Sequence, residues 1–178
     1  MTHANSSMGN GHTHTEPRAS RAHFPPGYIE TPADLLPWSH ALERLEQARV
    51  YWIASVRPNG RPHLTPIWGV WLDNVLYFDG SPESRRSRNI VTHPAIAVHV
   101  ERGNAGKDVV IMEGEAGEHR PELALAQRLA AAYGAKYAED GYAPSADQWD
   151  NGGLTATRPR FVVAWTDMNT ATRWHFDT

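Results

Sequence analysis

The sequence predicts a mainly β protein, a small barrel of about seven strands with a few peripheral helices. Short runs of β-branched and aromatic residues recur along the chain, and turn residues such as Asn59-Gly60 separate them. Helical periodicity is confined to a few stretches that do not alternate regularly with the strands, which argues against a doubly wound parallel sheet. We therefore expect strands that are mostly antiparallel and linked by hairpins.

Composition narrows the class of protein. The 178 residues suit one domain, which can bury roughly two thirds of its unfolded surface. A formal net charge of −3 argues against a general nucleic-acid binder, and the absence of cysteine removes disulfides, thiolate metal sites and thiol nucleophiles. No stretch approaches the ~20 apolar residues of a membrane span, and the N-terminus lacks the pattern of a secretory signal. We expect a cytoplasmic protein with no nucleic-acid or membrane partner.

Residues 1–33 are polar, with hardly any apolar side chains before Phe24. Such a segment buries too little surface to offset its ordering entropy, so we expect a disordered N-terminal tail followed by one domain over residues 34–178. The tail is rich in histidine, and metal binding by His12 and His14 is an alternative. A solvated tail is favoured because no periodic scaffold fixes ligand geometry there.

The first elements of the domain form an antiparallel meander. Leu42, Leu45 and Ala48 are spaced three apart among polar residues, which predicts a short amphipathic helix. The Asn-Gly hairpin then joins two strands, and Asp73-Asn74 turns the chain into a third. These three predicted strands span residues 50–56, 63–72 and 75–78.

The second half of the chain continues the pattern with strands and one longer helix. Leucine and alanine at helical spacing predict a helix over residues 121–137, and a long loop rich in turn residues follows over 139–158. The remaining predicted strands span residues 95–100, 109–113, 161–166 and 172–176.

The strand over residues 63–72 contains Pro66 and Gly69, which are unusual inside a sheet. Proline has no N–H for a ladder bond, so this stretch should be an edge, a bulge or a bend. Such irregularity marks either the close approach of a ligand to the backbone or a barrel corner without a ligand. Both alternatives stay open on this observation.

A short arginine-rich helix carries the clearest chemical signal. Ser81 is a good N-cap for it, Pro82 suits its first position, and His93-Pro94 ends it. Three arginines and an asparagine follow the start of this helix, and their side chains fall on or beside one exposed face. The residues are Arg85, Arg86, Arg88 and Asn89.

Guanidinium groups near a helix N-terminus match the charge and geometry of a phosphate, so this face predicts an anion site. The net negative charge of the chain makes the local cluster more informative, because it is not part of a general basicity. The alternative is a solvated helix face with no ligand.

Other candidate sites are weaker. Glu113 and Glu115 would lie on one face of a strand, where a solvent-facing pair is favoured over paired catalytic carboxylates. His63, His99 and His175 fit no metal-ligand spacing, and scattered core or surface histidines are favoured over a metal or haem site. Phosphate-loop, Rossmann, nucleophile-elbow and zinc-protease motifs do not occur.

Two tryptophans could contact a flat conjugated ring. Trp68 lies on the irregular strand and Trp174 near the C-terminus. A role as an ordinary core residue is favoured for any single tryptophan, so both assignments stay open.

The order of these elements resembles the pyridoxamine 5′-phosphate oxidase-like split β-barrel family. The resemblance rests on the Asn-Gly hairpin, the strand His63–Val70, the segment Ser84–Ile90 before His93-Pro94, and the strand Val109–Gly114. It covers about residues 38–178, and within the family the chain is most similar to the flavin/deazaflavin oxidoreductases that bind coenzyme F420. The fold implied is a six- to seven-stranded antiparallel split β-barrel with a few peripheral helices.

The resemblance also implies a function. It implies a homodimer with cofactor sites at the subunit interface, in which bound coenzyme F420 exchanges a hydride with a small unsaturated substrate of the CH–CH class. An FMN-dependent oxidoreductase and a non-catalytic cofactor- or haem-binding protein of the same fold are the alternatives. The cofactor performs the hydride chemistry, so no catalytic residue and no metal ligand are assigned.

The resemblance assigns the cofactor's phosphate to the arginine-rich helix and its ring edge to the irregular strand. Asp108–Val110 is implied to approach from the second subunit. Ser84 stands where some relatives place a basic residue, a role that Arg85 can assume. The residues implied to bind the cofactor are His63, Thr65, Pro66, Ile67, Trp68, Ser81, Ser84, Arg85, Arg86, Arg88 and Asn89.

Overall fold

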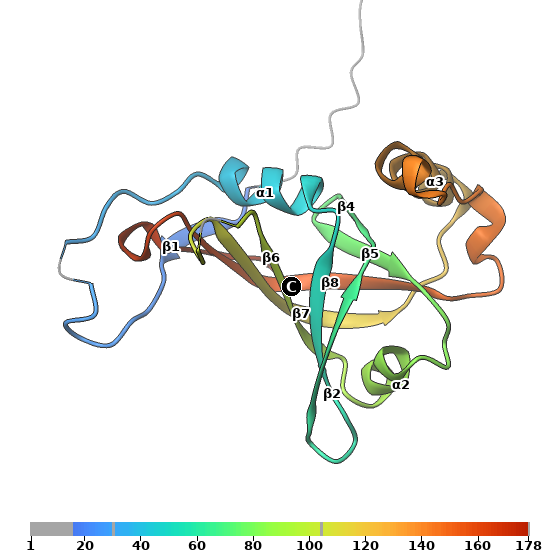
Figure 1. The fold of residues 1–178 in the computed structure, drawn as a ribbon, viewed down its shortest axis with the longest axis horizontal. Helices are drawn as coiled ribbons and strands as arrows, with labels where there is room; N and C mark the ends of the chain where they lie inside the picture. Colours follow the sequence, from blue (N-terminus) through green and yellow to red (C-terminus); the bar gives the residue numbers. More distant parts are fainter. Residues whose placement is uncertain (1–15, 30, 104, 178) are drawn as a thin grey trace, which may run out of the picture.

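The computed structural model describes residues 16–29, 31–103 and 105–177. Within these ranges the chain forms nine strands and three α-helices, and every strand pairing is antiparallel (Figure 1). The mainly β, split-barrel fold class is thereby confirmed, with a sheet that does not close on itself.

The strands are β1 (Arg18–Arg21), β2 (Tyr51–Val56), β3 (Pro62–Ile67), β4 (Val70–Leu72), β5 (Val75–Asp79), β6 (Ala95–Glu101), β7 (Val109–Glu118), β8 (Leu154–Trp165) and β9 (Thr172–His175). The α-helices are α1 (Trp38–Gln47), α2 (Arg85–Thr92) and α3 (Leu123–Tyr137). Short 3-10 helices cover Ala138–Asp140, Ala146–Trp149 and Met168–Thr170.

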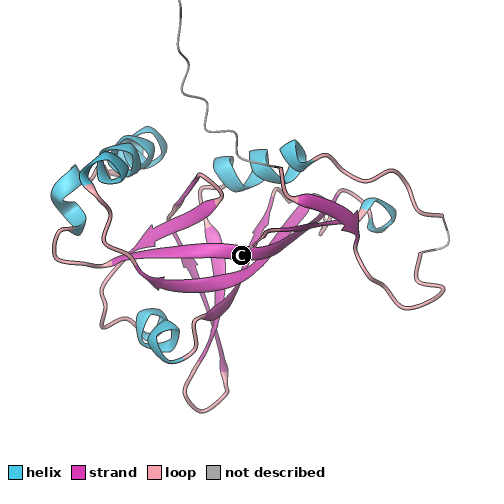
Figure 2. Ribbon diagram, turned by 180° about the vertical axis from the view of Figure 1, so that it is seen from behind, coloured by secondary structure: helices cyan, strands magenta, loops and turns pink. Residues whose placement is uncertain are grey.

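The strands follow one path through the sheet, β1-β9-β8-β7-β6-β2-β3, and β5 joins it by pairing with both β4 and β8. Two of the nine strands were not expected as separate elements. The strand predicted over residues 63–72 is divided into β3 and β4 by Trp68 and Gly69, and β1 lies upstream of all predicted strands. The helices lie around the outside of this sheet (Figure 2).

The ordered fold begins earlier than the expected boundary at residue 34. Strand β1 pairs with β9, with Arg18 opposite His175 and Arg21 opposite Thr172. The Arg21 guanidinium donates to the Asn169 carbonyl at 2.8 Å, which fixes this strand further. Residues 18–21 of the expected tail therefore belong to the sheet. His12 and His14 lie outside the described residues.

The β2–β3 and β4–β5 turns have different backbone conformations. In the β2–β3 hairpin only Gly60 has a positive φ, +79°, and the Gly60 N–H donates to the Arg57 carbonyl at 2.8 Å. A tight turn followed by a glycine in the left-handed conformation is typical of a three-residue hairpin loop. In the β4–β5 turn both Asp73 and Asn74 have positive φ, 52° and 60°, as a two-residue hairpin of mirror-image type requires.

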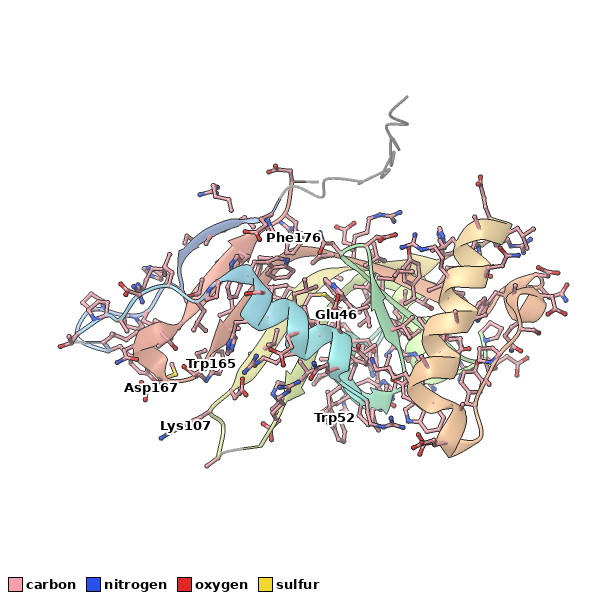
Figure 3. The ribbon with its side chains drawn as sticks, turned by 90° about the horizontal axis from the view of Figure 1, so that it is seen from above. Glu46, Trp52, Lys107, Trp165, Asp167 and Phe176 are labelled. Atoms are coloured by element: carbon pink, nitrogen blue, oxygen red, sulfur yellow. The ribbon has the colours of Figure 1, made fainter. Side chains whose placement is uncertain are left out.

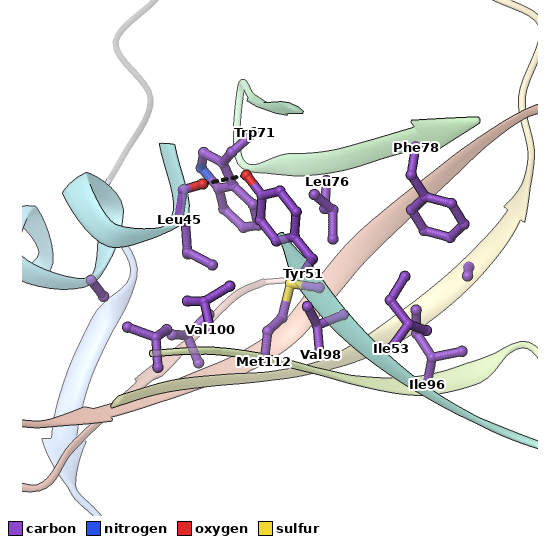
Figure 4. Packing of buried hydrophobic residues seen from close by; sticks show 14 of the residues in the cluster. Leu45, Tyr51, Ile53, Trp71, Leu76, Phe78, Ile96, Val98, Val100 and Met112 are labelled. Carbon is purple, nitrogen blue, oxygen red and sulfur yellow. Dashed lines mark hydrogen bonds between the residues drawn. The ribbon is translucent and has the colours of Figure 1, made fainter. Parts of the chain in front are cut away.

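The interior of the barrel is filled mainly by aromatic and branched side chains. Tyr51 and Met112 are fully buried at its centre, and the Tyr51 hydroxyl donates to the Leu45 carbonyl of α1 (Figure 4). Trp174 is only 1 % exposed and packs edge-on against Trp38, with ring centroids 5.5 Å apart. Trp174 is therefore a core residue, which is the alternative that the sequence favoured.

A second core cluster lies between α3 and the sheet. Its largest members are Tyr133, Tyr137 and Trp149, all fully buried or nearly so. Tyr137 reaches the break between β3 and β4, where its hydroxyl donates to the Gly69 carbonyl at 2.8 Å and accepts from the Gly69 N–H at 3.0 Å. Helix α3 thus fixes the bend that the sequence indicated at Gly69.

No helix in the described part of the chain combines the length and the apolar character needed to cross a membrane.

Candidate functional site

Helix α2 begins later than expected. Its N-cap is Ser84, whose hydroxyl accepts from the Ser87 N–H at 3.2 Å, and not Ser81. Ser81 lies in the turn before the helix, where its hydroxyl accepts from the Glu83 N–H at 3.1 Å. The expectation that Ser81 caps the helix is wrong, because Ser84 offers the same chemistry three residues later. The start at Arg85 places the arginines in the first turn of the helix.

The side chains expected on one exposed face of α2 point in different directions. Arg85 and Arg88 are exposed, whereas Arg86 is half-buried and Asn89 is fully buried. Asn89 donates from Nδ2 to the hydroxyl of Ser55 on β2 at 3.0 Å, and its carbonyl oxygen Oδ1 has no partner. Asn89 thus attaches α2 to β2, and Arg85 and Arg88 are the charged side chains that the helix exposes to solvent.

Arg86 is held against the end of β5. Its Nη2 donates to the Asp79 carbonyl at 3.1 Å, and its guanidinium lies over the Phe78 ring, 5.0 Å from the centroid. Burial lowers its pKa, and its Nε is buried without a partner. Gly80 makes room for it, because a Cβ at that position would lie 2.6 Å from Nη2. The expectation of a fully exposed Arg86 is therefore wrong.

The β2–β3 hairpin supplies the opposite wall of this site. Ser55 pairs with His63, and Ile53 pairs with Thr65, so strand alternation places His63 and Thr65 on the face toward which Asn89 reaches. The Nδ1 of His63 is buried without a partner. Burial lowers the pKa of His63, and the positive charges of Arg57, Arg85 and Arg86 lower it further.

Arg57 belongs to this site although it was not predicted. It follows β2 directly, its Nε is buried without a partner, and it acts electrostatically on His63 across the hairpin. A signal for it was present in the sequence, since alternation along β2 places residues 53, 55 and 57 on one face. We refer to Arg57, His63, Arg85, Arg86 and Asn89 together as the hairpin–α2 site.

Several polar atoms of this site have no hydrogen-bond partner among the described residues. Among the described residues, eight buried side-chain nitrogen or oxygen atoms have no hydrogen-bond partner, and four belong to Arg57, His63, Arg86 and Asn89. None of the arginines here forms an ion pair with a described carboxylate. Three of these four atoms, on Arg57, His63 and Arg86, are nitrogens that can donate, whereas Asn89 Oδ1 is an acceptor. Buried polar groups are normally satisfied, so the three unpartnered nitrogens favour a bound anion.

Residues 63–68, which were expected to face the cofactor ring, do not all lie on the side of the hairpin–α2 site. Thr65 is half-buried on the same face as His63, whereas Pro66 is exposed on the other face, opposite Trp52. Ile67 is 7 % exposed and packs in the core. Trp68 is 40 % exposed, and one face of its indole stacks on Tyr137 with centroids 4.9 Å apart and planes 10° apart. Its other contact is a tilted one with Tyr142.

The two weaker carboxylate candidates lie on β7. Glu113 and Glu115 are both exposed. The described residues contain no group of three or more side chains that could hold a metal ion. Asp108 is bound within its own chain, because Arg44 donates to its carboxylate from both Nε and Nη2, the second at 3.0 Å.

Comparisons with known proteins identify the family and the fold of the chain. The family model for pyridoxamine 5′-phosphate oxidase matches residues 38–161. No curated protein matches the chain. Among solved structures, the chain is similar to an F420 reductase, with 24 % identity, a TM-score of 0.51 and coverage of 67 % of this chain and 93 % of the other.

Two further solved structures show the range of the fold. An FAD-binding protein from Mesorhizobium loti has 18 % identity and a TM-score of 0.55, covering 78 % of this chain and 94 % of its own. HutZ, a haem storage protein from Vibrio cholerae, has 18 % identity and a TM-score of 0.52, covering 71 % and 91 %. At these identities the likeness shows a shared fold.

The open antiparallel barrel and its arginine-lined hairpin–α2 site define a split-barrel protein of the kind that holds small ligands. The chain belongs to the pyridoxamine 5′-phosphate oxidase family. That family includes oxidoreductases, and structures of the same fold include flavin- and haem-binding proteins.

Proposed function

We propose that this protein is an oxidoreductase that binds coenzyme F420 in the hairpin–α2 site and exchanges a hydride between it and a small unsaturated substrate. The observation that carries the proposal is the set of three partnerless buried nitrogen atoms on Arg57, His63 and Arg86. FMN is the second candidate, because its phosphate suits the same arginines.

The residues fit a cofactor with an anionic group. Arg85 and Arg88 are exposed in the first turns of α2, with their guanidinium groups available to solvent. The free N–H groups of that first turn and its partial positive charge favour the same ligand. Arg57 adds a cation from the hairpin side. We propose that these groups bind the cofactor's phosphate and set its orientation.

When bound, the deazaflavin or flavin ring supplies the hydride chemistry, and the protein supplies binding and orientation. Thr65 and Trp68 are the residues of the irregular strand best placed to meet the ring and its substrate. The Trp68 indole stacks on Tyr137, and the residue remains 40 % exposed, so its free surface can serve as a wall for an apolar substrate. Such a wall would exclude water from the reacting atoms.

We also propose that the chain forms a homodimer through the outer face of β2 and β3. This face carries large exposed apolar side chains, with Trp52 43 %, Val56 38 % and Leu64 61 % exposed. Trp52 projects at the margin of the molecule (Figure 3). Contiguous exposed apolar surface on a folded domain is typical of an interface. The opposite face of the same strands lines the hairpin–α2 site, so dimerisation would support that site.

Cofactor titration tests the proposal directly. Purified protein is titrated with F420 and with FMN, and the bound, reduced cofactor is then mixed with candidate enones. We expect micromolar binding of F420 and its oxidation by at least one enone. The variant Arg85→Ala/Arg88→Ala should bind at least tenfold more weakly, since a charge-assisted hydrogen bond contributes ~1.5–3 kcal/mol. Arg120→Ala, which removes an exposed arginine outside the site, is the matched control.

The results of these titrations distinguish the candidate functions. Tight binding of FMN alone would favour the flavin enzyme, and tight binding without turnover of any acceptor would favour a non-catalytic carrier. Binding of haem in preference to both cofactors would favour the haem-binding alternative. Equal cofactor affinity in the double variant and the wild type would exclude the hairpin–α2 site as the phosphate site.

A further inference from the structure

His63 differs from the other cationic groups of the hairpin–α2 site because it can change its charge near neutral pH. Arginine stays protonated in proteins, so Arg57, Arg85 and Arg86 present a fixed positive charge. A histidine titrates in the physiological range. We infer that His63 takes up a proton when an anion binds to this site, so that cofactor binding is coupled to pH. This inference rests on the proposed function.

The geometry leaves His63 without a partner of its own. Its Nδ1 is buried and unpartnered, and the described residues offer neither of its ring nitrogens a hydrogen bond. Ser55 lies opposite it on β2, but the Ser55 hydroxyl accepts from Asn89 and forms no described hydrogen bond with His63. A ring N–H of a protonated His63 therefore has an open position to fill with an oxygen of a bound anion.

The charges around His63 all have one sign. Arg57 faces it from the hairpin, and Arg85 and Arg86 face it from α2. Among the described residues, no carboxylate is a cause of the shift in its pKa. In the free protein this environment, together with burial, keeps the pKa of His63 below 6.5, so the ring is neutral at pH 7.

A bound anion reverses these effects. Its negative charge offsets the three arginines, and its oxygens accept from the imidazolium N–H, so both effects raise the pKa of His63 in the complex. A group whose pKa is higher in the complex than in the free protein makes binding tighter as pH falls through the range between the two values. Each unit of that difference corresponds to about a tenfold change in affinity.

Proton uptake can be measured with FMN and with F420 as probes. Calorimetric titration at pH 7 in two buffers of different ionisation enthalpy gives the number of protons taken up on binding. The wild type is compared with His63→Gln, which keeps a polar side chain but does not titrate. His175→Gln is the matched control, since His175 also has a pKa lowered by burial and by nearby arginines but lies on β9. The cofactor phosphate's own proton is common to all three proteins and cancels.

We expect the wild type and His175→Gln to take up more protons than His63→Gln, and their affinity to rise more steeply toward low pH. Equal uptake in all three proteins, with binding intact, would overturn the inference and leave the proposed function standing. Failure of the wild type to bind either cofactor would overturn both.

Proton NMR of the wild type provides an independent test if His63→Gln binds too weakly. The His63 ring signal should titrate at a higher pH with the cofactor present than without it. An unchanged or lowered pKa in the complex would overturn the inference.

Discussion

Asn89 of α2 donates a hydrogen bond to the Ser55 hydroxyl of β2 over 3.0 Å, and both side chains are almost completely buried. This bond fixes the arginine-bearing helix to the strand that leads into the hairpin. We expect Asn89→Ala to lower the free energy of unfolding by about 1–3 kcal/mol, because it leaves a buried hydroxyl unsatisfied. In urea denaturation the double variant Ser55→Ala/Asn89→Ala should lose less than the sum of the single losses, and strict additivity would contradict a direct coupling.

Arg86 and Arg88 should behave differently although they are two positions apart. Arg86→Ala removes a hydrogen bond to the Asp79 carbonyl and a cation–π contact with Phe78, so we expect it to destabilise the protein by roughly 1–2 kcal/mol. Arg88→Ala should leave stability within ~0.5 kcal/mol, because its side chain is exposed. Thermal unfolding compares the two variants, and equal losses would contradict the structural role of Arg86.

Lys136 makes stability depend on pH. Its ammonium group donates to the Tyr51 hydroxyl at 2.9 Å and to the Gly69 carbonyl at 3.0 Å, and burial lowers its pKa from 10.5 to about 7. Between these two values the unfolded chain binds more protons than the folded one, so stability gains from Lys136 as pH rises through this range.

The comparison of wild type with Lys136→Met isolates this contribution. From pH 7 upward the stability of the wild type relative to the variant should increase, by at most about 1.4 kcal/mol per pH unit. Urea denaturation at several pH values provides the measurement. A constant difference between the two proteins from pH 7 to pH 10 would show that the buried amine keeps an ordinary pKa.

Trp68→Ala tests the proposed substrate wall. The variant loses a stacking contact with Tyr137, which costs about 0.5–1.5 kcal/mol of stability, and retains the hairpin–α2 site. We expect cofactor affinity to change less than twofold and enone turnover to fall. Steady-state kinetics with the bound cofactor makes the measurement, and unchanged kinetics would remove Trp68 from the substrate pocket.

Leu64→Asp should break the proposed dimer. Leu64 is 61 % exposed on the outer face of β3, so a charge there would be tolerated in a monomer but not in a buried apolar interface. Analytical ultracentrifugation should show a dimer for the wild type and at least tenfold weaker association for the variant. Leu123→Asp, at a 68 % exposed position on α3, is the control. A monomeric wild type would contradict the proposal.

Most of the fold could be predicted from local sequence patterns. Strand alternation and turn residues located most strands from β2 to β9, although β3 and β4 were expected as one strand and the first residues of β8 as a loop. Gly60 adopts the positive φ expected at the hairpin turn. Strand β1 could not be predicted in this way, because residues 18–21 carry little apolar surface and depend on pairing with β9, about 150 residues away. Propensity carries no information on such a distant pairing.

The candidate site could be predicted only in part. The arginines of α2 were evident from their spacing, but the burial of Arg86 depends on the space beside Gly80, which helical periodicity does not show. Asn89 was assigned to the anion face, whereas its position over Ser55 follows from how α2 packs on β2. Arg57 was overlooked because it lies in a turn, where side-chain direction is set by the hairpin register.

The two prolines of β3 have a consequence for self-assembly. Strand β3 ends the path of strands through the sheet, and Pro62 and Pro66 lack the N–H groups that an added strand would need. Extension of the sheet from this margin into fibrils is thereby discouraged, even though Leu64 between them is strongly apolar. A neighbouring copy can pack against the side chains of β3, but it cannot add a regularly hydrogen-bonded strand to the edge of the sheet.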